Sequence, residues 1–128
     1  MTEVAALVFC VAIAGIVAFQ VALALGAPWG EYAMGGASPG RFPAPLRVLA
    51  VVQAVILVGL AVVVVARAGL ALPELAGAAA TLIWAVVGVS ALAVLLNAAS
   101  RSAGERRIWV PVALVLLGSS LVVALSAP

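Results

Sequence analysis

Four stretches of about 20 apolar residues dominate the sequence, and each is long enough to cross a bilayer. A helix rises about 1.5 Å per residue, so a hydrocarbon core of about 30 Å needs about 20 residues. The predicted spans run from Val4 to Leu25, Leu46 to Ala66, Glu74 to Leu96 and Ile108 to Leu125. The sequence therefore predicts an all-α polytopic membrane protein, with four transmembrane helices in one antiparallel bundle over residues 1–128.

Composition supports this fold and excludes several function classes. Of the 128 residues, 68% are hydrophobic and 8% charged, and the mean hydropathy is +1.42, whereas soluble domains carry about 25% charged residues. Histidine and aspartate are absent and Cys10 is the single cysteine. We therefore expect no metal, haem, disulfide or cofactor, and no conventional catalytic triad. A net charge of +2 is too small to indicate nucleic-acid binding.

Glycine and proline mark the predicted helix ends. Gly26 and Pro28 follow the first span as a helix stop. Pro45 and Pro73 suit the first turns of the second and third helices, where a missing N–H costs nothing. Met1-Thr2-Glu3 lacks the positive region of a signal peptide, so we expect the first span to be retained as a helix.

The fourth helix is expected to start before its apolar span. Ser102 and Glu105 have the spacing of a capping box, with Ser102 as the N-cap. Pro111 then falls in the second or third turn, where we expect it to kink the helix mildly.

Arginine distribution predicts the orientation. The face with both termini carries only Arg67, whereas the opposite face holds the other five arginines: Arg41, Arg47, Arg101, Arg106 and Arg107. The positive-inside rule places the five in the cytoplasm. We therefore expect a multi-pass protein of a bacterial inner membrane with both termini outside, and the five-to-one bias argues against a dual topology.

Two loops on the predicted cytoplasmic face concentrate the polarity. The first, residues 26–45, contains "GAPWGEYAMGG" and is longer than the usual helix–helix connection. It is an ordered functional loop, a re-entrant segment or a flexible one, and its aromatic residues favour order at the interface. The second, "LNAASRSAGERRIWVP", brings arginines close to the first, so that Glu31 and Glu105 could each pair with one.

Gln20 and Gln53 lie at matching depths, about 7–10 Å in from the cytoplasmic ends of the first two spans. One interpretation is a hydrogen-bonded clasp between the two helices. The other is that both line a polar pocket beneath the loops.

Small residues at four-residue spacing predict a packing stripe on the first span: Ala6, Cys10, Ala14, Ala18 and Ala22. A similar stripe on the third span starts at Gly77 and could be its partner, within the bundle or in a dimer. Trp84, near mid-membrane, is interpreted as a bulky filler or as a pocket wall.

These features define a candidate ligand site at the cytoplasmic mouth. Its predicted residues are Gln20, Trp29, Glu31, Tyr32, Gln53, Asn97, Arg101, Glu105, Arg106 and Trp109. The competing interpretation is structural, with Gly26 as a helix cap and with Trp29 and Tyr32 as headgroup anchors. No nucleotide-binding loop is present, and each glutamate lies in a loop or at a span end, which disfavours proton-coupled transport.

The chain resembles uncharacterised small four-helix membrane proteins of high-GC bacteria, actinobacteria above all. "LGAPWGEYAMGG", "PGRFPAPLRV" and "LNAASRSAGERRIWVPVALVL" carry the resemblance. It implies a four-helix fold and transfers no catalytic or binding residue. The bundle is also distantly similar to sterol-isomerase-type membrane folds, but lacks the acidic residues that such a site needs inside the bundle.

Two functions therefore remain. The first is binding or transport of a lipid headgroup or a small amphipathic or anionic ligand at the cytoplasmic mouth. The alternative is a structural or accessory subunit that docks on another membrane protein through its small-residue faces. Expected partners are the lipid bilayer and either a second copy or another membrane protein, and enzymatic activity is the weakest option.

Overall fold

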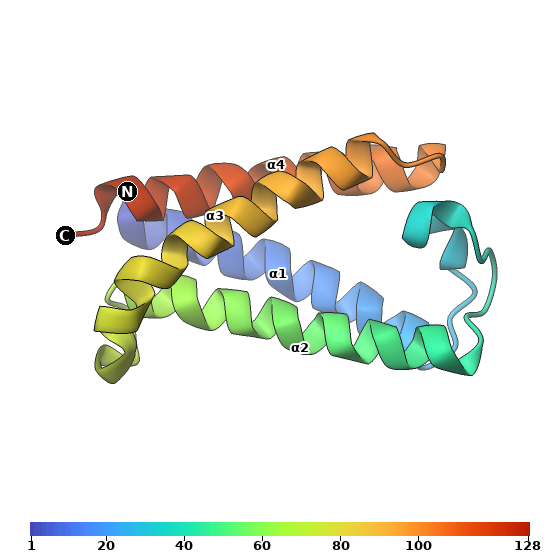
Figure 1. Cartoon of the computed structure of the whole chain (residues 1–128), viewed down its shortest axis with the longest axis horizontal. Coiled ribbons are helices and arrows are strands. Elements are labelled where there is room, and N and C mark those ends of the chain that lie inside the picture. The colour runs from blue at the N-terminus through green and yellow to red at the C-terminus, as the bar shows by residue number, and fades with distance from the viewer.

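The computed structural model describes residues 1–128 and confirms an all-helical bundle (Figure 1). Its helices are α1 Thr2–Ala24, α2 Ala44–Arg67, α3 Ala76–Ala98 and α4 Ala103–Ser126. Short 3-10 turns precede α2 and α3: η1 Gly30–Tyr32, η2 Met34–Gly36 and η3 Pro73–Leu75. All four helices are long and apolar enough to cross a membrane. The chain is therefore a multi-pass membrane protein by length and composition.

The helix ends follow the local sequence signals. Gly26, with φ +100°, ends α1 in a Schellman motif in which the Ala27 N–H donates to the Ala22 carbonyl at 2.9 Å. Pro45 occupies the first turn of α2, as expected. Ser102 is the N-cap of α4 and its hydroxyl oxygen accepts the Glu105 N–H at 3.1 Å, which confirms the predicted early start of this helix.

The half of the bundle that holds the termini is tightly packed. The N- and C-terminal ends lie together in Figure 1, and a 2.6 Å hydrogen bond joins the hydroxyls of Thr2 and Ser126. All four helices contribute to the main core cluster of Ala5, Ala6, Phe9, Ile13, Val64, Ile83, Val86, Leu116 and Val123. Phe9 is fully buried at the centre of this half.

The opposite half is more open. The pair formed by α1 and α2 separates from the pair formed by α3 and α4 toward the loops that precede α2 and α4 (Figure 1). Only a small second cluster of Leu23, Phe42 and Ala50 forms there, beneath the longer loop. A closed half and a hollow half thus share the same four helices.

The structure contradicts the expected pairing of the α1 and α3 stripes within the bundle and both interpretations of Trp84. α1 packs against α2 and α4, and α3 against α4 and α2, so the small-residue stripes of α1 and α3 do not meet as partners within the bundle. Ala14 and Ala18 are exposed on the outer surface. Trp84 is 50% exposed on α3, so it is neither a core filler nor a pocket wall.

Candidate functional site

A cavity of about 500 Å³ occupies the hollow half, within the range of about 300–1,000 Å³ typical of ligand pockets. Every helix and the loop before α2 contribute to its lining. From α1 and α2 come Ile16, Phe19, Gln20, Gln53, Ile56, Leu57 and Leu60. From α3 and α4 come Val89, Ala93, Leu96, Asn97, Glu105, Trp109, Val112, Ala113 and Leu116, and from the loop Tyr32, Ala33, Met34, Gly35 and Phe42.

The lining is polar at one end and apolar at the other. On each helix, the polar lining residue lies closest to the loops: Gln20 on α1, Gln53 on α2, Asn97 on α3 and Glu105 on α4. Deeper positions on the same four helices carry Ile16, Leu60, Val89 and Leu116. The cavity is therefore amphipathic along the bundle axis.

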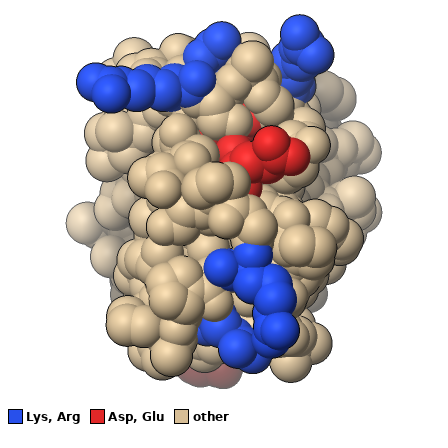
Figure 2. Space-filling view, turned by 90° about the vertical axis from the view of Figure 1, so that its right-hand side faces the viewer, with Lys and Arg blue, Asp and Glu red and all other residues tan.

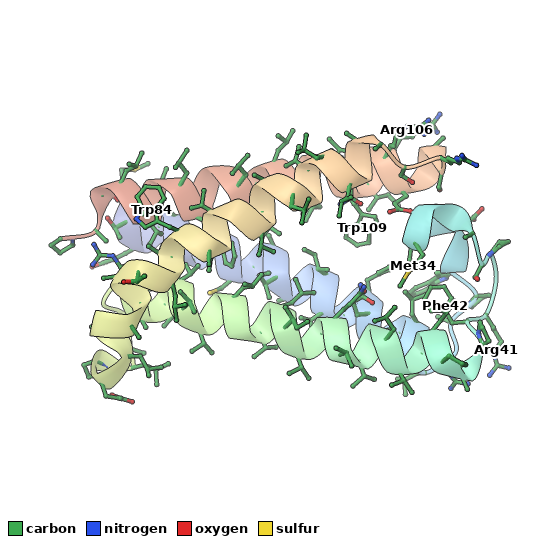
Figure 3. The ribbon with its side chains drawn as sticks, in the orientation of Figure 1. Met34, Arg41, Phe42, Trp84, Arg106 and Trp109 are labelled. Carbon is green, nitrogen blue, oxygen red and sulfur yellow. The ribbon has the colours of Figure 1, made fainter.

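Aromatic side chains close the side between α1 and α4. The rings of Phe19 and Trp109 lie 4.7 Å apart, and Trp29 stacks on Phe19 from outside at 6.3 Å. Trp109 points into the space between the two helix pairs, and Met34 faces it from the loop (Figure 3). This contact joins the helix pairs at the level of the cavity.

The loop that carries η1 and η2 covers the polar end and is fastened to α4. The Gly35 N–H donates to Glu105 Oε2 at 2.8 Å, and the Trp109 Nε1–H donates to the Tyr32 carbonyl at 2.8 Å. The Ser102 hydroxyl donates to the Glu31 carbonyl at 2.6 Å. These three contacts, which we call the latch, make the loop an ordered wall of the cavity.

Glu105 serves the latch instead of completing its capping box. A full capping box returns the acidic side chain to the N-cap N–H, but the Ser102 N–H donates to Ser100 Oγ at 3.1 Å. The left-handed backbone of Met34 and Gly35, with φ 55° and 69°, turns the Gly35 N–H toward the carboxylate. Glu105 is only 8% exposed.

Two glycines permit this close packing. A Cβ on Gly30 would lie 1.9 Å from the Ser38 carbonyl oxygen, and one on Gly104 would lie 2.4 Å from Tyr32 Cε1. Gly30 also donates its N–H to the Gly40 carbonyl at 2.9 Å, which holds the two arms of the loop together. Larger residues at either position would displace the wall.

The side between α2 and α3 has no such closure. Ile56, Val89 and Leu96 line the cavity and are 55%, 44% and 63% exposed. The two helices approach each other at η3 and separate toward the loops (Figure 1). The cavity therefore opens laterally, through apolar side chains that face the surrounding lipid.

The five arginines of this end lie outside the cavity. Figure 2 shows two basic groups at this end with acidic side chains between them, and Arg41 and Arg106 point outward in Figure 3. Arg47 Nε donates to the Ala24 carbonyl at 2.8 Å, which caps α1, and Arg106 donates to the Ser100 carbonyl. They therefore serve helix ends and the exposed rim.

The structure brings six of the ten predicted site residues to the cavity: Gln20, Tyr32, Gln53, Asn97, Glu105 and Trp109. The other four, Trp29, Glu31, Arg101 and Arg106, lie outside its lining. Sequence reasoning missed Phe19, Met34 and Phe42. The position of Phe19 beside Gln20 was the signal that could have found it.

The expected polar pairings do not form. No hydrogen bond joins Gln20 to Gln53; both side chains line the cavity instead, as the second interpretation held. Glu105 accepts a backbone N–H, and no ion pair joins Glu31 or Glu105 to an arginine. The Tyr32 phenol donates a hydrogen bond to the Glu31 carboxylate, and this bond, together with the negative charge of Glu31, raises the pKa of the phenol above its ordinary value of 10.0.

We compared the chain with protein-family models, curated proteins and solved structures, and none of them matches. The resemblance to actinobacterial membrane proteins therefore stays a prediction, and the cavity carries the functional argument alone.

Proposed function

We propose that the protein binds a small amphipathic molecule that enters the cavity sideways from the bilayer, as a binding protein or as one step of transport. The observation that carries this proposal is the amphipathic lining, polar near the loops and apolar in depth on all four helices. A ligand oriented like a lipid would place its head at Glu105 and its tail beside Leu60 and Leu116.

Access through lipid follows from how the walls are made. The latch covers the polar end and the Phe19–Trp109 contact covers the α1–α4 side. The remaining opening is lined by Ile56, Val89 and Leu96, which contact lipid more favourably than water. If the arginine-rich end is cytoplasmic, the ligand comes from the cytoplasmic leaflet.

The proposal is tested by fluorescence quenching in uncharged maltoside micelles. A protein with Trp109 alone, made by Trp29→Phe and Trp84→Phe, is titrated with a tail-brominated long-chain alcohol. We expect saturable quenching, because Trp109 lines the cavity. A protein with Trp84 alone reports simple partition into the micelle, since Trp84 is 50% exposed on the outer surface.

Ala93→Phe fills the cavity and should abolish the saturable component. Ala85→Phe is the matched control, because Ala85 lies on the same helix but is exposed outside the cavity lining. Quenching of Trp109 that is linear, or that survives Ala93→Phe, would overturn the proposal.

The accessory-subunit alternative has one observation in its favour. Small residues remain exposed on the outer surface, among them Ala14 and Ala18 on α1 and Gly77 on α3, where another helix could approach closely. Loss of association with a second copy or partner in an Ala14→Leu, Ala18→Leu protein, together with no saturable quenching, would favour this alternative over ligand binding.

A further inference from the structure

We propose that the head group of the ligand is a cation, specifically an alkylammonium, held by Glu105 and Asn97. This inference rests on the proposed function and names the chemistry of its ligand. It is carried by the inventory of charges, donors and acceptors at the polar end of the cavity.

Glu105 is the only charged residue that lines the cavity. The residue is only 8% exposed. A buried carboxylate needs compensation from hydrogen bonds or a positive charge. The single backbone N–H of Gly35, at 2.8 Å, occupies only Oε2.

Two N–H donors at this end are occupied by the latch, whereas two side-chain oxygens remain without a partner. The Gly35 N–H and the Trp109 indole N–H are both taken by the latch. Asn97 donates from Nδ2 to the Ala93 carbonyl at 2.7 Å, which leaves its Oδ1 free. Arg67 Nε is the only fully buried side-chain nitrogen or oxygen that lacks a hydrogen-bond partner. Because Glu105 Oε1 and Asn97 Oδ1 also lack a partner, both oxygens must keep some accessible surface.

Aromatic side chains at the same end of the cavity add surfaces that can attract a positive charge. Phe19, Tyr32, Phe42 and Trp109 line the same end of the cavity as Glu105. The negative face of an aromatic ring attracts a cation within about 6 Å of its centre. An ammonium group, which has only donors, matches the two free oxygens.

An anion would find no positive charge here. No arginine lines the cavity, so an anion would meet only neutral donors such as the amides of Gln20 and Gln53. The arginines around the rim also oppose the approach of a cation from water, while solvent and salt screen their effect inside. The cation is therefore expected to arrive from the lipid side, tail first.

The test compares three tail-brominated probes of equal chain length in the Trp109-only protein: a primary alkylammonium, the alcohol and the alkyl sulfate. We expect the ammonium to bind about tenfold more tightly than the alcohol, and the sulfate more weakly than both. Each value is corrected for partition with the Trp84-only protein.

Glu105→Gln should reduce the ammonium-to-alcohol ratio from about tenfold to about one, because the amide oxygen still accepts the Gly35 N–H but the charge is gone. Glu31→Gln is the matched control: it removes the same charge from an exposed loop position outside the cavity lining and should keep the ratio at about tenfold. Thermal unfolding checks that Glu105→Gln remains folded.

The outcomes separate the two proposals. Saturable binding of ammonium and alcohol with equal affinity, abolished by Ala93→Phe, would overturn the cation inference and leave the proposed function standing. Tightest binding of the sulfate, or a ratio that Glu105→Gln does not change, would also overturn the cation inference. If no probe binds saturably, the proposed function fails, and the cation inference fails with it.

Discussion

The two halves of this bundle are made from the same four apolar helices, yet one is filled and the other hollow. At the terminal half, Phe9 and eight smaller buried residues close the space between the helices. At the loop half, Phe42 and the η1–η2 turns contribute to the space between the helix pairs, which touch directly through Phe19 and Trp109. A loop used as a wall can therefore keep helices apart where side chains alone would bring them together.

The largest expected loss of stability is in the filled half. Phe9→Ala should destabilise the protein by about 2–3 kcal/mol, less than the about 3–5 kcal/mol of soluble cores, because lipid is as apolar as the protein interior. Thermal unfolding in micelles measures this loss. Val11→Ala, at a position that is 74% exposed on the same helix, should change stability little, and equal effects at both positions would contradict a packed half.

The second-largest loss of stability is expected in the loop that forms the wall of the hollow half. Gly30→Ala places a Cβ 1.9 Å from a backbone oxygen, and we expect a loss of about 1–2 kcal/mol as the loop shifts. Limited proteolysis of residues 26–43 should accelerate in parallel. Gly59→Ala, where a Cβ meets nothing within 4 Å, is the control; unchanged proteolysis in Gly30→Ala would show that the loop is not held as described.

A smaller effect is expected from the latch alone. Trp109→Phe keeps an aromatic ring near Phe19 but removes the 2.8 Å hydrogen bond to the Tyr32 carbonyl, which predicts a loss of about 1 kcal/mol. Trp84→Phe changes a lipid-facing ring and should be neutral. Equal unfolding temperatures for the two variants would show that this hydrogen bond does not stabilise the loop against α4.

The smallest expected effect concerns Tyr32, the only tyrosine in the chain. Because its folded pKa is raised above 10.0, any stability from the protonated phenol is present below that pH and is lost as pH rises through the folded pKa. Glu31→Gln should return the titration midpoint toward 10.0, measured by tyrosinate absorbance. An unchanged midpoint would show that Glu31 does not act on the phenol.

Sequence reasoning predicted the fold well because apolar length and helix caps are local signals. The predicted ends of the first three spans agree with the structure within two residues, and Ser102 caps α4 as expected. Part of the cavity lining could be predicted from the depth of polar residues along the spans. Gln20, Gln53 and Asn97 were placed together because they lie near the loop ends of their helices.

The remaining features of the site depend on backbone and side-chain orientations, which residue spacing does not encode. Glu31 and Glu105 looked equivalent as loop acids beside arginines, but the left-handed turn at Met34 and Gly35 turns a backbone N–H toward Glu105. Spacing along the sequence also does not give the order of the helices around the bundle. That order shows that the α1 and α3 stripes do not face each other. The packing angles of the helices decide which polar residues line the cavity and which lie on the exposed surface.

Pro111 continues α4 without a break, but it has no N–H to give to the carbonyl of Arg107 one turn earlier. The first two turns of α4, which carry Ser102, Glu105 and Trp109, are therefore tied to the rest of the helix by one fewer bond than their neighbours. Any bending of α4 is therefore expected at Pro111, between the latch residues and the filled half of the bundle.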